Sequence, residues 1–128
     1  MRQLTWSDFD EAVWKISAEH HGRAFNGVYG FPRGGLCLAV ALSHHLELPL
    51  LLEPEEDCLI VDDIYETGRT LTQLKHLPGC EAVVWISKVR PTWFRAVEVI
   101  DSPEWIVFPW EDPEAAAADE EAYRASRE

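Results

Sequence analysis

The sequence has few basic residues. Among its 128 residues, 11 are Lys or Arg and 23 are Asp or Glu, so the formal net charge at pH 7 is −12. Proteins that bind nucleic acids need clustered Lys and Arg to displace counterions from phosphates, and this balance therefore argues against a nucleic-acid surface. A small anion could still bind, because a few basic residues can line a positive pocket inside an acidic shell.

The sequence also lacks a long apolar run, a charged-then-apolar leader and an even set of cysteines. We therefore expect no membrane span, no export and a cytoplasmic location. Cys37, Cys58 and Cys80 are widely spaced in apolar stretches, which favours buried free thiols over a disulfide framework or a zinc site. The length and the 47% apolar content suit one small domain.

The most informative stretch is LIVDDIYETGRTL, residues 59–71. Its first three residues are apolar, as in a parallel strand buried on both faces, and the polarity changes abruptly at Asp62. The turn at residues 66–70 then opens a predicted helix. Ligands of open α/β sheets bind outside the carboxyl ends of the strands, and N–H groups at a helix start can hold an anion. This order of elements predicts a site for a phosphorylated sugar.

Each residue type in this stretch suits one part of such a ligand. Gly68 has no side chain, so backbone N–H groups can approach phosphate oxygens closely, while Thr67 and Thr70 add hydroxyl donors. Asp62 and Asp63 accept hydrogen bonds when ionised, which suits vicinal sugar hydroxyls or a hydrated Mg²⁺. Taken alone, the acid pair is equally compatible with an ordinary helix-capping turn, and that alternative stays open.

A second Gly-rich turn, Phe31-Pro32-Arg33-Gly34-Gly35, follows another predicted strand. Its glycines expose backbone donors, and Arg33 supplies a cation that suits a diphosphate. A Gly-rich turn that merely carries an exposed arginine is the simpler alternative.

The hydrophobic pattern predicts alternating strands and helices, and therefore a parallel sheet with right-handed crossovers. The expected elements are a helix capped by Ser7 and ended by Gly22, a strand at 27–31, a helix at 36–46, a short apolar run at 48–52, the strand at 59–61, a helix from Gly68 to Pro78, and a strand at 82–87. Two histidine pairs, His20-His21 and His44-His45, each point to different helix faces, so we expect solvated positions rather than metal ligands.

The stretch LIVDDIYETGRTL resembles the phosphoribosyl pyrophosphate (PRPP) signature of type I phosphoribosyltransferases. VYGFPRGGL, residues 28–36, resembles their pyrophosphate loop. WIVFPWE, residues 105–111, is similar to the purine-side segment of bacterial xanthine-guanine phosphoribosyltransferases, and LTWSDFDEAVWKI is similar to their first helix. The resemblance spans residues 4 to about 112. It implies a compact α/β fold of the type I phosphoribosyltransferases, with a mainly parallel central sheet flanked by helices and a small hood from the C-terminal segment.

We expect that domain over residues 1–112, followed by an acidic, Ala-rich tail over 113–128 that is a frayed helix or disordered. The implied activity is transfer of a 5-phosphoribosyl group from PRPP to a purine base, with a 6-oxopurine favoured, Mg²⁺ as cofactor and pyrophosphate as the leaving group. Glu66 occupies the acid/base position, while Asp62 and Asp63 hold the ribose and the metal. The implied 5′-phosphate site is Glu66, Thr67, Gly68, Arg69 and Thr70.

The resemblance implies two further subsites. The pyrophosphate site is Arg33, Gly34 and Gly35, where proteins of this family often have a cis peptide, here between Pro32 and Arg33. The base site is Lys88, Trp105 and Ile106, because a 6-oxo group needs a cation or donor and a flat heterocycle needs an aromatic face. A purely structural role for Trp105 is the alternative, and Trp110 is expected to be structural.

Two features depart from the family pattern. The acid/base position is usually aspartate, so the longer Glu66 points to a different reach or an altered base. Relatives also have a long mobile segment that closes over the site, whereas only residues 53–57 join two apolar runs here. Because a parallel crossover needs a dozen or more residues, we expect 48–52 to be antiparallel to its sequence neighbour or not a regular strand. We also expect the acidic 53–57 segment to be a poor lid that repels pyrophosphate.

Two function classes follow: a compact purine phosphoribosyltransferase, acting as a homodimer, or a non-catalytic regulator that binds PRPP or a nucleotide. A phosphoacceptor receiver domain ranks last, because in such domains the acid pair follows the first strand.

Overall fold

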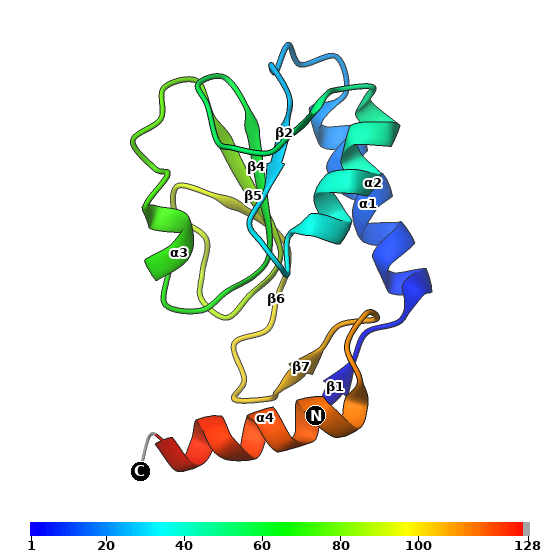
Figure 1. Cartoon of the computed structure of the whole chain (residues 1–128), viewed down its shortest axis with the longest axis vertical. Coiled ribbons are helices and arrows are strands. Elements are labelled where there is room, and N and C mark those ends of the chain that lie inside the picture. Colours follow the sequence, from blue (N-terminus) through cyan, green and yellow to red (C-terminus); the bar gives the residue numbers. More distant parts are fainter. Residues whose placement is uncertain (127–128) are drawn as a thin grey trace. The chain divides into compact units, whose positions relative to one another are not determined.

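The computed structural model describes residues 1–126, which form two compact units (Figure 1). The smaller unit combines Met1–Glu11 with the chain from Ser102 onward, and the larger unit is Ala12–Asp101. Among the described residues, no helix is long and apolar enough to cross a membrane.

The larger unit is built on a five-stranded parallel sheet with the order β3-β2-β4-β5-β6. Its strands are β2 (Val28–Gly30), β3 (Leu50–Leu51), β4 (Leu59–Tyr65), β5 (Glu81–Ser87) and β6 (Arg95–Val99). All four neighbouring pairs are parallel. Three helices flank the sheet: α1 (Trp6–His20) and α2 (Leu36–Leu46) lie on one side, and α3 (Arg69–Thr72) lies on the other (Figure 1). The α/β prediction is confirmed; β6 is a strand that the sequence analysis did not predict.

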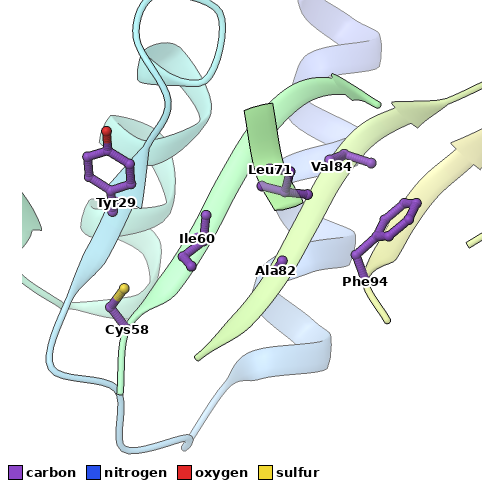
Figure 2. Close-up of a cluster of buried hydrophobic side chains, with 7 residues drawn as sticks. All are labelled: Tyr29, Cys58, Ile60, Leu71, Ala82, Val84 and Phe94. Carbon is purple, nitrogen blue, oxygen red and sulfur yellow. The ribbon is translucent and has the colours of Figure 1, made fainter. Parts of the chain in front are cut away.

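Alternate residues of the central strands build the two core layers. Ile60, Ala82 and Val84 point toward α3, where they meet Leu71 and Phe94 in one buried cluster (Figure 2). The intervening strand residues and the helix residues on the other side are also buried, among them Val13, Ile16, Val28, Leu38, Leu42, Leu59, Val61 and Val83. The central strands are therefore apolar on both faces, as the unbroken apolar runs predict. The three cysteines are free thiols, with Cys58 buried and the others half-buried.

The start of α1 differs from the prediction. The helix is capped by Thr5 rather than Ser7: Asp8 N–H donates to Thr5 Oγ1 at 3.1 Å, and Thr5 N–H donates to Asp8 Oδ2 at 2.8 Å. This reciprocal pair satisfies two amides at once, which a cap at Ser7 would not.

The expectation for residues 48–52 was wrong, because β3 is a strand and it runs parallel to β2. Val28 of β2 faces Leu50 on one side and Leu59 on the other. Because β3 has only two residues, a short segment is enough to bring the chain back past the start of β2, so that β4 begins on the other side of β2. Asn26, just before β2, holds that segment through hydrogen bonds to the carbonyl oxygens of Glu56 and Asp57, at 3.1 and 2.7 Å. The rule that a parallel crossover needs a dozen or more residues applies to strands of ordinary length and does not hold here.

The helix predicted between Gly68 and Pro78 is reduced to the four residues of α3. Beyond it, the N–H groups of Leu74, Lys75 and Leu77 each donate to the carbonyl three residues earlier. Such tight turns replace the second half of the expected helix.

The smaller unit has its own two-stranded parallel sheet and its own aromatic cluster. β1 (Arg2–Gln3) pairs with β7 (Ile106–Val107), and α4 (Pro113–Ser126) follows. Trp110 stacks on Phe108 with ring centroids 5.2 Å apart, which agrees with a structural role. Residues 113–126 are helical, and residues 127–128 of the predicted tail lie outside the described part of the chain. The domain boundary after residue 112 stays a prediction.

Candidate functional site

The candidate site lies at the carboxyl ends of β2 and β4. The chain leaves β2 toward β3 on one side, whereas β4 leads to β5 and β6 on the other, so the strand order reverses between β2 and β4. A crevice outside such a reversal is where open α/β sheets bind ligands. Here it forms a cavity of about 290 Å³, lined by Phe31, Pro32 and Gly34 after β2 and by every residue from 62 to 71.

Most of the predicted site residues meet in this cavity. They are Gly34 of the first turn and Asp62, Asp63, Glu66, Thr67, Gly68, Arg69 and Thr70 of the second stretch. Arg33 is exposed and Gly35 is buried, and neither lines the cavity. Lys88 lies at the same edge of the sheet, since its N–H donates to the Tyr65 carbonyl at 2.8 Å, but it is also outside the lining.

The other two predicted base-site residues belong to the smaller unit. Ile106 is buried in β7, and its register partner is Arg2. Trp105 is half-buried, and its ring lies 5.4 Å from that of Tyr123. Their assignment to a base site stays a prediction.

The first turn folds tightly against β4. Gly35 N–H donates to the Phe31 carbonyl at 2.7 Å, and the bond between Pro32 and Arg33 is cis, as the resemblance suggested. A Cβ at Gly34 would collide with the Asp63 carboxylate. Only glycine therefore lets the turn approach the acid pair this closely.

The acid pair at the end of β4 has unusual electrostatics. Asp62 is buried and Asp63 is half-buried, and Asp63 N–H donates to Asp62 Oδ1 at 2.8 Å. Burial, followed by repulsion from Asp63, raises the pKa of Asp62 to about 8. Burial also raises the pKa of Asp63. Among the described residues, neither carboxylate has a cationic partner. The pair therefore favours a shared proton or an incoming cation.

The second turn presents small polar groups to the cavity. Gly68 has a φ of 78°, which strongly favours glycine, and Arg69 N–H meets Thr67 Oγ1 at 3.4 Å. Thr67, Arg69 and Thr70 are exposed. Because α3 has one turn only, its macrodipole contributes little, and anion binding would depend on local N–H groups, hydroxyls and the Arg69 charge.

The sequence analysis missed several lining residues, notably Tyr65, Ile64 and Phe31. Tyr65 stacks on Phe94 with ring centroids 4.0 Å apart. The only sequence signal was their position inside or beside the two turns, and an aromatic or apolar residue there reads equally well as core.

No protein-family profile matches the sequence. A search of curated proteins finds no match either.

Solved structures do match. Three of the most similar are two phosphoribosyltransferases and one hypothetical protein. A purine phosphoribosyltransferase from Pyrococcus horikoshii Ot3 has a TM-score of 0.72 and 27% identity, covering 86% of this chain and 93% of its own. A xanthine-guanine-hypoxanthine phosphoribosyltransferase from Helicobacter pylori has a TM-score of 0.65 and 20% identity, covering 92% and 98%.

A hypothetical protein from Neisseria gonorrhoeae with bound ppGpp has a TM-score of 0.61 and 15% identity, covering 95% of this chain and 97% of its own. Adenine and orotate phosphoribosyltransferases share the fold as well. The chain therefore has the fold of the type I phosphoribosyltransferases, and the named enzymes among its structural neighbours act on purines or orotate.

Proposed function

We propose that this protein transfers a 5-phosphoribosyl group from PRPP to a purine base, with a 6-oxopurine favoured, and releases pyrophosphate. The observation that carries the proposal is one cavity in which the acid pair meets both Gly-rich turns at the strand-order reversal. The fold neighbours support phosphoribosyl transfer in general. The protein would act in the cytoplasm as a homodimer.

The two turns would divide the phosphates of PRPP between them. Thr67, Arg69 and Thr70, with the backbone of Glu66 and Gly68, would bind the 5′-phosphate. Arg33 and the backbone of Gly34 and Gly35 would bind the pyrophosphate group. Arg33 is exposed in the described structure, so its side chain would have to turn toward the ligand when PRPP binds.

A Mg²⁺ ion fits the acid pair. The described residues hold no cluster of three or more metal-binding side chains, but Mg²⁺ needs only one or two carboxylates when substrate oxygens and water complete its shell. One buried and one half-buried carboxylate, both with raised pKa values and neither with a cationic partner among the described residues, would be stabilised by a dication. Asp62 and Asp63 would hold the ion, which when bound would neutralise charge on the leaving pyrophosphate.

The side chains of the site would control charge during transfer. Asp62 and Asp63 would also favour the positive charge that develops at the reacting ribose carbon. Glu66 lines the cavity and is exposed, and its carboxylate would act as the acid/base group toward a purine nitrogen. Lys88, at the same edge of the sheet, would contact the base. The resemblance also assigns Trp105 and Ile106 to the base, and their part stays a prediction. Because Glu66 is one methylene longer than aspartate, base preference is the least constrained part of the proposal.

The proposal is tested by incubating the protein with PRPP, Mg²⁺ and one of guanine, xanthine, hypoxanthine or adenine. Nucleotide is separated by chromatography, and the Asp62→Asn/Asp63→Asn double variant serves as the control. Nucleotide formed by the unaltered protein alone supports the transferase and identifies its base. PRPP binding without nucleotide formation contradicts it.

The second candidate is a regulator of the same fold that binds PRPP or a nucleotide without catalysis. Asp57 N–H donates to the Pro78 carbonyl at 3.0 Å, and Asn26 bonds to the carbonyl oxygens of Glu56 and Asp57, so the end of segment 53–57 lies at the amino ends of the strands. None of residues 53–57 lines the cavity. A bound ppGpp in one structural neighbour also favours this candidate.

A further inference from the structure

Tyr65 is a cavity residue whose chemistry the proposed site does not use. It is the last residue of β4, directly before the second turn, and it lines the cavity together with residues 66–70. Its ring packs on the buried Phe94, at a centroid separation of 4.0 Å and an interplanar angle of 22°. The ring is therefore held on the core side, and only the hydroxyl end remains to be explained.

The hydroxyl lies against the second turn. A Cβ at Gly68 would collide first with Tyr65 Oη and then with the ring carbon that carries it. Among the described residues, this hydroxyl makes no hydrogen bond. If the residue served packing alone, an apolar side chain of similar width would fill the same space without placing a donor beside Gly68.

We infer that Tyr65 is a further ligand of the phosphate bound by the second turn, with its hydroxyl donating a hydrogen bond to a phosphate oxygen. The inference rests on the proposed function, because it assumes that the turn binds the 5′-phosphate of a phosphorylated ribose. Two features support it: stacking fixes the position of the hydroxyl, and the hydroxyl stands beside the one turn residue that has no side chain. A prepositioned donor loses little freedom when the anion arrives.

The test is a titration with ribose 5-phosphate, followed by the ³¹P resonance, on the unaltered protein, Tyr65→Phe and Tyr29→Phe. The first variant removes the hydroxyl and keeps the ring on Phe94. Tyr29→Phe is the matched control, because Tyr29 belongs to the same buried cluster but does not line the cavity. Melting curves of all three proteins show whether the fold is intact.

We expect Tyr65→Phe to bind ribose 5-phosphate roughly tenfold more weakly, as for the loss of one hydrogen bond to a charged group, and the control to bind normally. Unphosphorylated ribose, followed by its proton resonances because it contains no phosphorus, should give the same weak or absent binding with all three proteins. Equal affinity of Tyr65→Phe and the unaltered protein overturns the inference and leaves the proposed function standing. Failure of the unaltered protein to bind ribose 5-phosphate overturns both.

Discussion

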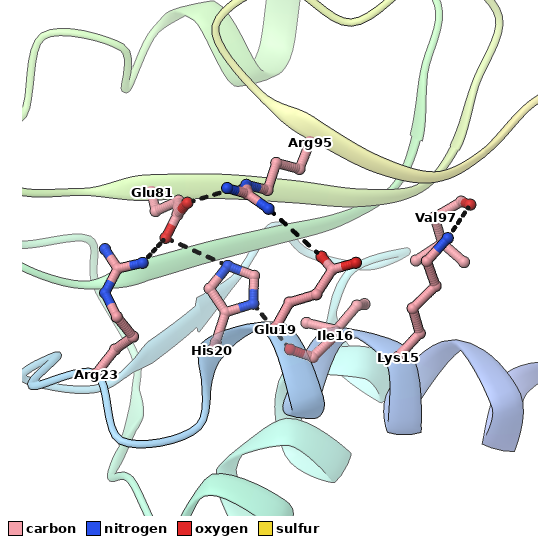
Figure 3. A network of polar contacts seen from close by, with 8 residues as sticks. All are labelled: Lys15, Ile16, Glu19, His20, Arg23, Glu81, Arg95 and Val97. Carbon is pink, nitrogen blue, oxygen red and sulfur yellow. Dashed lines mark hydrogen bonds and ion pairs between the residues drawn. The ribbon is translucent and has the colours of Figure 1, made fainter.

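The carboxylates at the two ends of strands β4 and β5 have opposite surroundings. At the amino end, Glu81 is surrounded by cations: Arg23 Nη1 lies 3.0 Å from Glu81 Oε2, and Arg95 Nε lies 3.2 Å from Oε1 (Figure 3). His20 Nε2 lies 3.3 Å from Oε2, while His20 Nδ1 faces the Ile16 carbonyl at 2.8 Å. At the carboxyl end, Asp62 and Asp63 accept hydrogen bonds from the backbone N–H groups of Asp63 and Ile64, both at 2.8 Å, but no cation pairs with them among the described residues.

The difference distinguishes an acid whose charge is compensated within the chain from a pair whose charge is not. Glu81 is compensated within the chain and ties α1 to the sheet. No cation compensates the charge of the acid pair among the described residues. The pKa values of both acids are raised because burial disfavours their ionised form. Carboxyl groups with raised pKa values in a cavity are stabilised by a proton or by a bound cation. We therefore expect ligand binding at the carboxyl edge of the sheet.

Neutralising the acid pair should have the largest effect. In Asp62→Asn/Asp63→Asn, nucleotide formation should fall at least about 100-fold, because both metal binding and charge stabilisation are lost. The melting temperature should not fall, since the change removes two repelling acids. A clear drop in melting temperature would show that the pair is structural, like Glu81.

Neutralising Glu81 at the amino edge should lower stability without affecting catalysis. Glu81→Gln leaves Arg23 and Arg95 without their shared counter-charge and should cost about 2 kcal/mol, less than a fully buried pair because both arginines are half exposed to solvent. Urea unfolding measures the loss. The activity per folded molecule should stay the same, and a loss of activity would mean that the two edges are coupled.

The pH dependence sharpens the comparison. The pKa of Asp62 is raised from 3.8 to about 8 on folding, so the folded state binds more protons than the unfolded state between these values. This contribution to the free energy of unfolding is present at low pH and is lost as the pH rises toward 8. Asp62→Asn should flatten that slope in urea titrations across this range. An unchanged slope would show that the aspartate has an ordinary pKa.

Gly34→Ala tests how closely the first turn must approach the acids. The added Cβ collides with the Asp63 carboxylate, so PRPP binding should weaken about tenfold with little change in stability, because the displaced group is the end of a side chain. Gly22→Ala is the matched control. It has open space but a φ of 81°, and it should cost about 1 kcal/mol of stability without affecting PRPP binding.

The smallest effect is expected for the acidic segment 53–57. The sequence predicted that it repels pyrophosphate, but none of its residues lines the cavity, and Glu56 and Asp57 are held at the amino edge by Asn26 and the Pro78 carbonyl. Glu55→Gln/Glu56→Gln should leave the KM for PRPP unchanged. A lower KM would show that the acidic segment does repel the pyrophosphate group of PRPP.

The sequence predicted the strands that are apolar on both faces and the two turns, because burial and glycine leave clear signals. It did not predict that β3 could be a parallel strand of two residues, since its register depends on a neighbour distant in sequence. It also placed His20 in solvent, whereas the side chain is buried, because Glu81 of β5 and the ring of Phe25 in the loop after α1 lie against it. Tyr65 was missed because stacking on Phe94 involves residues 29 positions apart.

The central claim is that the carboxyl-edge cavity binds PRPP through an acid pair that awaits a cation. Calorimetric titration of PRPP with Mg²⁺ at pH 7, in two buffers of different ionisation enthalpy, tests it directly. Binding that requires Mg²⁺ and releases a proton, with the release absent in Asp62→Asn, is the predicted result. Binding that is independent of Mg²⁺ and releases no proton would contradict the account.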